Sequence, residues 1–472
     1  MQKKTKIVAT ISDKNCTTQF IRKLYNEGMN VVRLNTAHQT PEDSLRVVND
    51  VRKVSDKIAI LLDTKGPEVR TVACDTGIAV QKGQEIYIEG NPLGSSSESC
   101  IVVNYAGFVA DVPDNAIILI DDGDIELKGI KKEGNRLLCE VMNTGVVKQR
   151  KSVNVPNVSF RLPSVSEKDK EYIKFAIKHD LDFIAHSFVR NTKDVAEIQS
   201  ILDEYDSPIK IIAKIENQEG VDNIDDILEH VYGVMVARGD LAIEIPYAKI
   251  PGIQRMLINK CIELRKPVII ATQMLHTMID NPRPTRAEVN DIASAIYNQT
   301  DAIMLSGETA YGDYPVEAVR TMANVAIEVE KTKEVMNDIP VVIINNEVSG
   351  FLCKSAVEAS IRLDTKALIA DSTSGRTIRS LAAYRGAKTI YAHCYSHRTM
   401  RELALSYGVY SVYMEPRDTS HEFLLDALTG LLDRHTFDPD DRIVVIAGNF
   451  GRGYGASYIE IGTVSNLIGH LS

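Results

Sequence analysis

The sequence of 472 residues predicts an α/β protein: a (β/α)8 (TIM) barrel with an inserted β-barrel lid domain and a C-terminal doubly wound α/β domain. Three observations predict this fold. Eight short apolar segments alternate with helix-like segments between residues 6 and 335. A β-rich stretch interrupts this alternation after the third apolar segment, and a second strand–helix alternation follows residue 340. The expected boundaries are 1–69 and 153–337 for the barrel, 70–152 for the lid and 338–472 for the C-terminal domain.

The eight apolar segments are expected to form the barrel strands. Most are nearly continuous hydrophobic runs, as strands covered on both faces require. Helix start signals lie between them, for example Ser166 followed by Glu167. Parallel strands that alternate with helices in this number close into a barrel. The expected strands are KIVATIS (6–12), VVRLN (31–35), IAILLD (58–63), DFIAHSF (182–188), IKIIAKIE (209–216), GVMVARGD (233–240), PVIIAT (267–272) and AIMLS (302–306).

The segment after the third strand is too long for a strand-to-helix connection. From Thr71 to about Lys151 it carries the β-rich runs GIAVQKG, EIYIEG, AIILID, IELKGI and RLLCEVM, separated by turn signals. We expect a small β-barrel or sandwich that closes over the barrel mouth. After residue 340 the runs ALIAD, TIYAH and RIVVIAG alternate with the helix-like TIRSLAAYR and RTMRELALSYG, which predicts a doubly wound sheet.

Composition excludes several classes of function. The net charge of −10 offers no basic surface for nucleic acid. The N-terminal stretch MQKKTKIVAT lacks the apolar run of a signal peptide or membrane span, so no membrane partner is expected. The seven cysteines have neither CxxC nor zinc-like spacing, so we expect packed thiols and a cytoplasmic protein.

Polar residues cluster where the expected strands end, which is where (β/α)8 barrels carry their reaction sites. Lys214 and Glu216 stand two apart, so both side chains face the same side of one strand. Asp240 ends the next strand. Two carboxylates beside an ammonium suit a divalent cation such as Mg²⁺ or Mn²⁺ and a transferring phosphoryl group. The alternative is a structural ion pair with capping.

The ends of the second and third strands carry groups that suit phosphate and cations. Arg33 can clamp a phosphate bidentately. Oxygen atoms of Asn35, Asp63 and Thr64 can coordinate a further cation. Taken alone, the Asp63-Thr64 pair fits a helix cap or a turn at least as well.

Two further groups of residues indicate chemistry at the same end of the barrel. Thr272 and Ser306 supply hydroxyls at the last two strand ends, where they can orient water or donate a proton; ordinary polar capping is the alternative. Lys65, Arg70 and His38 add positive or titratable groups nearby, which indicates phosphate-rich substrates.

The C-terminal domain contains a candidate effector site. A hydroxyl-rich segment lies between an expected strand and an expected helix, so its hydroxyls and amides can hold a phosphate, although a capped turn fits as well. The loop GNFGRGYG (448–455) is not a dinucleotide fingerprint, because no clear helix follows it. The residues of the candidate site are Ser372, Thr373, Ser374, Gly375, Arg376 and Thr377.

The sequence resembles pyruvate kinase over essentially its whole length. The matching strings are TKIVATI, GMNVVRLN, LLDTKGPEVR, DDGDIEL, VNVP, LPSVSEKD, SFVR, KIENQEG, VARGDLAIEIP, ATQML, PRPTRAE and MLSGETAYGDYPVEAV. The resemblance implies phosphoryl transfer from phosphoenolpyruvate to ADP, giving pyruvate and ATP. It also implies Mg²⁺ or Mn²⁺, K⁺ and a homotetramer.

The resemblance implies roles for the residues at the strand ends. Glu216 and Asp240 resemble the divalent-metal ligands, Lys214 the cation that stabilises the moving phosphoryl group, and Arg33 the phosphate clamp. The amides around Ala237, Gly239 and Asp240 resemble those that receive the substrate carboxylate. Thr272 and Ser306 resemble the hydroxyls near the methylene carbon. The residues expected to meet the nucleotide are His38, Arg70 and Lys151, with Asp122 near the lid hinge.

One departure from the family pattern concerns potassium. Ala37 stands where the family has a serine hydroxyl, so we expect a weakened K⁺ site completed by Asn35, Asp63 and Thr64, with Glu68 matching potassium-dependent members. Two hypotheses follow: an active enzyme regulated by a phosphorylated effector, or a weakened relative that senses phosphorylated metabolites. A carbon–carbon lyase on the same barrel would explain neither the lid nor the C-terminal domain.

Overall fold

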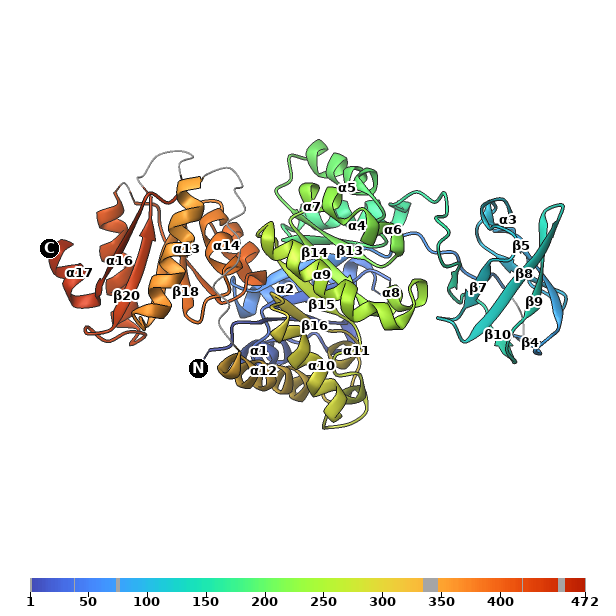
Figure 1. Ribbon diagram of the computed structural model, residues 1–472, viewed down its shortest axis with the longest axis horizontal. Helices are drawn as coiled ribbons and strands as arrows, with labels where there is room; N and C mark the ends of the chain where they lie inside the picture. The colour runs from blue at the N-terminus through green and yellow to red at the C-terminus, as the bar shows by residue number, and fades with distance from the viewer. Residues whose placement is uncertain are drawn as a thin grey trace.

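The computed structural model describes residues 2–37, 39–73, 77–333, 347–417, 419–448 and 455–471. Three parts lie in a row: an insertion of β-strands at one end, the barrel in the middle and a C-terminal α/β part at the other end (Figure 1). The predicted fold class is confirmed. Among the described residues no helix is both long enough and apolar enough to span a membrane.

The central part is a closed barrel of eight parallel strands in the order β1-β16-β15-β14-β13-β12-β3-β2. Each strand falls within one of the eight predicted apolar segments, and nearly every residue in it is buried, as continuous apolar runs require. The strands are β1 (Lys6–Thr10), β2 (Val31–Asn35), β3 (Ala59–Asp63), β12 (Phe183–His186), β13 (Lys210–Ile215), β14 (Gly233–Ala237), β15 (Val268–Ala271) and β16 (Ala302–Leu305).

The barrel helices begin at hydrogen-bonded caps. Ser166 caps α4 through a capping box with Asp169, as its sequence signal predicts, and Thr40 and Thr285 do the same for α2 and α10. Each such cap stabilises its helix by about 1 kcal/mol. The longer barrel helices are α1 (Thr18–Asn26), α2 (Pro41–Val54), α4 (Glu167–Lys178), α5 (Thr192–Glu204), α7 (Ile224–His230), α9 (Ile250–Glu263), α10 (Arg286–Tyr297) and α12 (Pro315–Thr332).

The expected strand over 233–240 is too long. Strand β14 ends at Ala237, and the next residues form helix α8 (Arg238–Glu244). Asp240 therefore lies in the first turn of a helix instead of at a strand end. A carboxylate is favourable there because the helix N-terminus is the positive end of its dipole.

The insertion has its own apolar core, which both of its sheets cover. One sheet has six strands in the order β11-β7-β8-β9-β5-β6, and the other pairs β10 with β4. The elements are β4 (Ile78–Val80), β5 (Glu85–Gly90), β6 (Cys100–Val103), α3 (Phe108–Asp111), β7 (Ile117–Ile120), β8 (Ile125–Glu133), β9 (Arg136–Val141), β10 (Gly145–Val147) and β11 (Val153–Asn154).

The C-terminal part is a five-stranded sheet in the order β19-β18-β17-β20-β21, parallel except for the antiparallel edge strand β21. One apolar cluster packs with α13 and α14 and another with α16 and α17, so helices cover both faces as predicted. The elements are α13 (Glu347–Arg362), β17 (Ala367–Ser372), α14 (Arg376–Ala383), β18 (Thr389–Cys394), α15 (His397–Glu402), β19 (Val409–Tyr413), α16 (Ser420–Asp433), β20 (Arg442–Ala447), β21 (Tyr458–Thr463) and α17 (Val464–Leu471).

The sequence prediction missed part of this sheet. The run expected as one helix over 398–408 contains α15 and a short 3-10 turn at Leu403–Leu405, and the chain then reverses at Gly408 (φ 70°) into β19. Strand β19 has only five residues, and their mixed polarity does not predict a strand. Of the loop at 448–455, only residues 448 and 455 lie within the described part of the chain.

A buried ion pair joins the C-terminal part to the barrel. Arg385 donates to both carboxylate oxygens of Asp301, at 2.9 and 2.6 Å, and to the backbone carbonyl of Gln299 at 2.9 Å. The two paired side chains are 2% and 5% exposed. The Asp301 carboxylate also accepts the backbone N–H groups of Val268 in the barrel and of Tyr407 in the C-terminal part. It therefore forms hydrogen bonds to both parts.

Candidate active site

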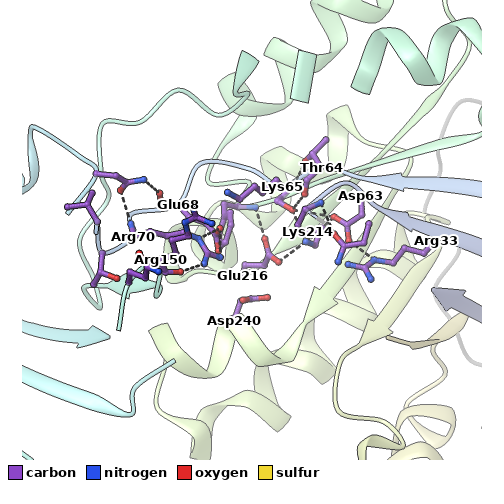
Figure 2. A pocket seen from close by; sticks show the side chains of 18 of the residues that line it. Arg33, Asp63, Thr64, Lys65, Glu68, Arg70, Arg150, Lys214, Glu216 and Asp240 are labelled. Carbon is purple, nitrogen blue, oxygen red and sulfur yellow. Dashed lines mark hydrogen bonds and ion pairs between the residues drawn. The ribbon is translucent and has the colours of Figure 1, made fainter. Parts of the chain in front are cut away.

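A cavity of about 1010 Å³ opens at the carboxyl ends of β2, β3 and β13, where the chain passes into the insertion (Figure 2). Charged side chains of the barrel line one side, and residues of the insertion line the other. The lining residues are Arg33, Asn35, Ala37, Asp63, Thr64, Lys65, Glu68, Arg70, Thr71, Val72, Ala73, Asn104, Gln149, Arg150, Ser187, Phe188, Lys214, Glu216 and Asp240.

Lys214 lies at the centre of the buried charges in this cavity (Figure 2). Its Nζ atom is 3.1 Å from Asp63 Oδ1 and 3.0 Å from Glu216 Oε1, and it donates to Ser187 Oγ at 2.7 Å. Burial by itself lowers the pKa of Lys214, but the carboxylates of Asp63 and Glu216 outweigh burial and raise this pKa above its usual value. Lys214, whose side chain is 11% exposed, is therefore held as an ammonium ion.

Glu216 and Asp240 form a pair of carboxylates beside Lys214. Glu216 Oε2 accepts the backbone N–H of Phe188 at 2.6 Å. Burial raises the pKa of Glu216 to about 7 against the opposing charge of Lys214, and burial also raises the pKa of Asp240. Both pKa values are raised because the charge of Lys214 offsets only part of the cost of burial, and a divalent cation would add positive charge here.

The donor set at this pair fits a cation that takes ligands from outside the protein. Within the described ranges, no group of three or more His, Cys, Asp or Glu side chains is arranged to hold a metal. Two carboxylates leave the other coordination positions to substrate and water, as is usual for Mg²⁺ in phosphoryl-transfer sites.

Arg33 and Asp63 connect β2 and β3 at the cavity floor. Arg33 Nε lies 2.6 Å from Asp63 Oδ2, and Arg33 Nη1 donates to Thr10 Oγ1 at 3.0 Å. Burial alone raises the pKa of Asp63, but Lys214 and Arg33 reverse this effect and hold it below its usual value. Both oxygens of Asp63 are therefore occupied by cationic partners.

The residues expected to bind potassium lie together on the cavity wall, next to Ala37. Asn35 Oδ1 accepts the backbone N–H of Ala37 at 3.2 Å. Thr64 Oγ1 donates to a carbonyl of β12 at 3.2 Å and accepts the N–H of Ser187 at 3.1 Å. His38, expected to meet the nucleotide, lies outside the described residues.

Thr272 follows β15 in a left-handed conformation, with φ 69°. A β-branched residue adopts this region only under strain, at a cost of about 1–3 kcal/mol. Its Oγ1 atom donates to the carbonyl of Ala271 at 2.6 Å and accepts the N–H of Gly239 at 2.8 Å. The Gly239 amide, expected to receive a substrate carboxylate, is therefore bonded to the Thr272 hydroxyl; Ala237 ends β14 just before it.

Ser306 follows β16, the neighbour of β15 in the barrel. Its backbone N–H donates to Glu308 Oε2 at 2.7 Å. Thr272 and Ser306 therefore end adjacent strands at the same edge of the barrel, although neither lines the 1010 Å³ cavity.

The two described residues expected to meet the nucleotide differ in position. Arg70 lines the cavity, where it pairs with Glu68 at 2.8 Å and donates to the carbonyl of Arg150 at 2.6 Å. Lys151 instead pairs with Asp121 at 2.8 Å and does not line the cavity. Asp122 is held by Ser152 Oγ at 2.8 Å and lines a second cavity on the other side of the linkers.

Sequence reasoning missed several residues of this site. Ser187 falls within the predicted strand 182–188 and was given no role, yet it bonds Lys214 directly, and Phe188 holds Glu216 through its backbone. Asn104, Gln149 and Arg150 enter the cavity from the insertion. A polar residue directly after a strand was the available signal for Ser187. The insertion residues had none, because their position depends on how two separate cores pack.

Comparison with known families agrees with this geometry. The sequence model described as the pyruvate kinase barrel domain matches residues 2–319, and the one described as the pyruvate kinase alpha/beta domain matches residues 351–461. The chain belongs to the pyruvate kinase family. A pyruvate kinase of Borreliella burgdorferi is 47% identical over 473 residues, covering 99% of each chain. One of Staphylococcus epidermidis is 42% identical over 456 residues, covering 94% of this chain and 78% of the relative.

Among solved structures, a pyruvate kinase from Cryptosporidium parvum superposes with a TM-score of 0.92 at 32% identity, covering 98% of this chain and 96% of the other. The expectation of a phosphotransferase of the pyruvate kinase type is confirmed. Enzymes of this family use a divalent metal and K⁺.

The candidate effector segment joins β17 to α14, as its pattern predicts. Gly375 has φ 75° and donates its N–H to Ser372 Oγ at 2.8 Å. Ser374 Oγ accepts from Arg376 Nε at 3.2 Å, and the carbonyl of Thr373 accepts from Thr399 at 2.9 Å. The segment is thus a hydroxyl-lined turn at a helix start.

Proposed function

We propose that the 1010 Å³ cavity transfers the phosphoryl group of phosphoenolpyruvate to ADP, with Lys214 as the group that stabilises the transfer. The observation that carries this proposal is the ammonium of Lys214 held 3.0–3.1 Å from two buried carboxylates. Phosphoryl transfer depends on positioning and on neutralising charge on the equatorial oxygens. An ammonium already fixed in position supplies this neutralisation with little reorganisation during the reaction.

Glu216 and Asp240 would hold Mg²⁺ or Mn²⁺, which would neutralise charge that develops on the substrate. Their raised pKa values support this assignment, since the buried Glu216 and the half-buried Asp240 lie close together. Arg33 would bind the phosphoryl oxygens, because Asp63 orients its guanidinium towards the cavity that it lines.

The substrate carboxylate would bind at the first turn of α8, near Ala237, Gly239 and Asp240. Thr272 would protonate the enolate through water, with Ser306 at the neighbouring strand end. The hydrogen bond between Thr272 Oγ1 and the Gly239 amide supports this reading, because it places the hydroxyl beside the carboxylate site.

The insertion would supply the nucleotide contacts. Arg70 lines the cavity and supports this role, and Arg150 joins it from the same wall. Lys151 and His38 complete the proposed set. K⁺ would bind beside Asn35, Asp63 and Thr64, with water in the place of the hydroxyl that Ala37 lacks.

The finer properties of the molecule are also proposals. We infer a homotetramer in the cytoplasm, regulated by a phosphorylated ligand at residues 372–377. The hydroxyl-lined turn supports the effector site. The free, mostly buried thiols of the six cysteines in the described ranges support a reducing compartment.

A coupled assay with phosphoenolpyruvate, ADP and Mg²⁺ tests the central proposal. We expect pyruvate formation by the parent enzyme and a loss of at least about 10³-fold in kcat for Lys214→Met. Lys214→Arg serves as the matched control for charge. Equal turnover by Lys214→Met and the parent would disprove the assigned role, and no turnover by the parent would disprove the proposed reaction.

A further inference from the structure

Residues 158–162 return the chain from the insertion to the barrel, yet they pack as part of the insertion. The Phe160 ring stacks on Phe108 with 5.6 Å between centroids, and it meets Tyr105 edge-on at the same distance. Arg161 forms an ion pair with Asp111 at 2.6 Å. The position of this segment therefore defines the position of the insertion.

Arg190 binds the backbone of the same segment from the barrel side. Its Nη1 atom donates to the carbonyl oxygen of Phe160 at 2.7 Å, and its Nη2 atom donates to that of Leu162 at 3.1 Å. Asp194 holds the guanidinium in place through Nε and Nη2, each at 2.9 Å. The side chains of Arg190 and Asp194 are only 20% and 6% exposed, so this is a largely buried ion pair and not a surface one.

The contact lies in the wall of a cavity of about 520 Å³ between the insertion and the barrel. Arg190, Phe160 and Leu162 line this cavity together with Asp122 of the insertion and Asp240 of the active site. The return segment therefore borders the same cavity as both aspartates.

The loop that carries Arg190 begins in the active site. Ser187 bonds Lys214, and Phe188, with φ 55°, donates its N–H to Glu216. A Cβ atom on Gly66 of the outgoing linker would lie 2.8 Å from the Phe188 ring, so this end of the loop is packed tightly. The hydrogen bonds of Ser187 to Lys214 and of Phe188 to Glu216 do not involve the Arg190 guanidinium.

We propose that Arg190 is a positioning residue that fixes the insertion over the active-site cavity through the carbonyls of Phe160 and Leu162. The planar fork of arginine matches this task, because its three nitrogens reach two carbonyls and one carboxylate at once, whereas the donors of lysine all lie on one nitrogen. The inference rests on the proposed function, since the nucleotide groups on the insertion, such as Arg70, move with it.

Two variants test the proposal, Arg190→Met and Arg190→Lys. A small displacement of a binding wall costs about 10²-fold in rate, so we expect kcat/KM for ADP to fall by that factor in Arg190→Met and by less in Arg190→Lys. The dissociation constant of phosphoenolpyruvate with Mn²⁺, measured by calorimetry, should stay within about twofold because Ser187 and Phe188 keep their bonds. Amide hydrogen exchange in residues 156–162 should become faster.

Arg161→Met is the matched control, because it removes an arginine–aspartate pair within the insertion and leaves the two carbonyl contacts intact. We expect it to change kcat/KM for ADP by less than about threefold. The proposal fails if Arg190→Met keeps the parent's ADP constants and exchange rates, or if its ADP and phosphoenolpyruvate constants weaken in parallel with its melting temperature. A parent without turnover would refute the proposed function, while the exchange measurement would still decide the role of Arg190.

Discussion

Arg238, the first residue of α8, donates from Nη2 to the backbone carbonyl oxygen of Thr272 at 2.6 Å, and Thr272 has the left-handed φ of 69°. Its Nη1 atom pairs with Asp291 of α10 at 2.8 Å. Strain at a functional residue persists only when its surroundings determine the conformation. The guanidinium between Thr272 and Asp291 is one such determinant.

Replacing Arg238 should therefore impair chemistry more than folding. We expect Arg238→Met to lower kcat about 10²-fold, because the Thr272 hydroxyl loses its fixed position, with a small change in KM for phosphoenolpyruvate. Asp291→Asn, which leaves the bond to Thr272 intact, should have a milder effect. Steady-state kinetics of both variants check this expectation, and equal losses in both would contradict it.

Divalent-metal affinity should depend on Glu216. We expect Glu216→Gln to weaken Mn²⁺ binding at least about 10-fold, since one of two carboxylate ligands is lost, and chelation to abolish turnover by the parent. Glu244→Gln is a control in the neighbouring 520 Å³ cavity and should keep the parent's affinity. Calorimetric titration of the proteins with Mn²⁺ measures the difference.

The dependence of activity on K⁺ should change when Ala37 is replaced by serine. Ala37→Ser adds the hydroxyl that the family pattern places there, so we expect the K⁺ concentration for half-maximal activity to fall several-fold. Ala37→Gly adds no oxygen and should leave that concentration unchanged. Assays across a K⁺ series, with ionic strength held constant by a tetraalkylammonium salt, separate a specific effect from screening. Identical K⁺ curves for Ala37→Ser and the parent would contradict the site.

Glu244 should make stability depend on pH. Burial raises the pKa of Glu244 to about 7 from its ordinary 4.5, so the folded state binds this proton more tightly than the unfolded chain does. The resulting stabilisation is fully present below pH 4.5 and is lost as the pH rises through 7. We therefore compare the unfolding free energy of Glu244→Gln with that of the parent at two pH values. The difference should favour the variant by on the order of 3 kcal/mol more at pH 8 than at pH 4.5. Urea unfolding without metal measures this, with exposed Glu229→Gln as the control.

The barrel and the C-terminal part should lose stability together when Arg385 is removed. We expect Arg385→Met to cost about 3–5 kcal/mol, because Asp301 is left buried without its cationic partner. Arg320→Met breaks the more exposed pair with Glu27 and should cost less than about 1 kcal/mol. Chemical unfolding of both variants gives the comparison, and similar losses would contradict the expected effect of burial.

Most of the fold was predictable because the barrel strands are covered on both faces, and continuous burial produces the apolar runs that the sequence displays. The ends of elements were less predictable. Asp240 lies in helix α8 (Arg238–Glu244), which was not predicted because its start has no side-chain cap. Strand β19 was missed because its residues are of mixed polarity and only partly buried.

The positions of the barrel residues that line the cavity were predictable, because parallel strands bring their carboxyl ends together whatever the intervening sequence. Lys214, Glu216 and Asp63 are in contact for this reason. The insertion side was not predictable in the same way. Lys151 pairs with Asp121 while its neighbour Arg150 lines the cavity, a choice that depends on the exact turn at φ 60° in Arg150.

The two linkers of the insertion meet, since Arg70 pairs with Ser152 in an antiparallel bridge and Val153 donates its N–H to the carbonyl of Val69. During folding, this junction shortens the effective connection between β3 and β12. Once the insertion has formed around its own core, β3 and β12 are joined by little more than two adjacent linkers, and the entropy of closing the barrel is that of a much shorter loop. The junction thus allows the barrel to carry a separate domain at small cost to its own assembly.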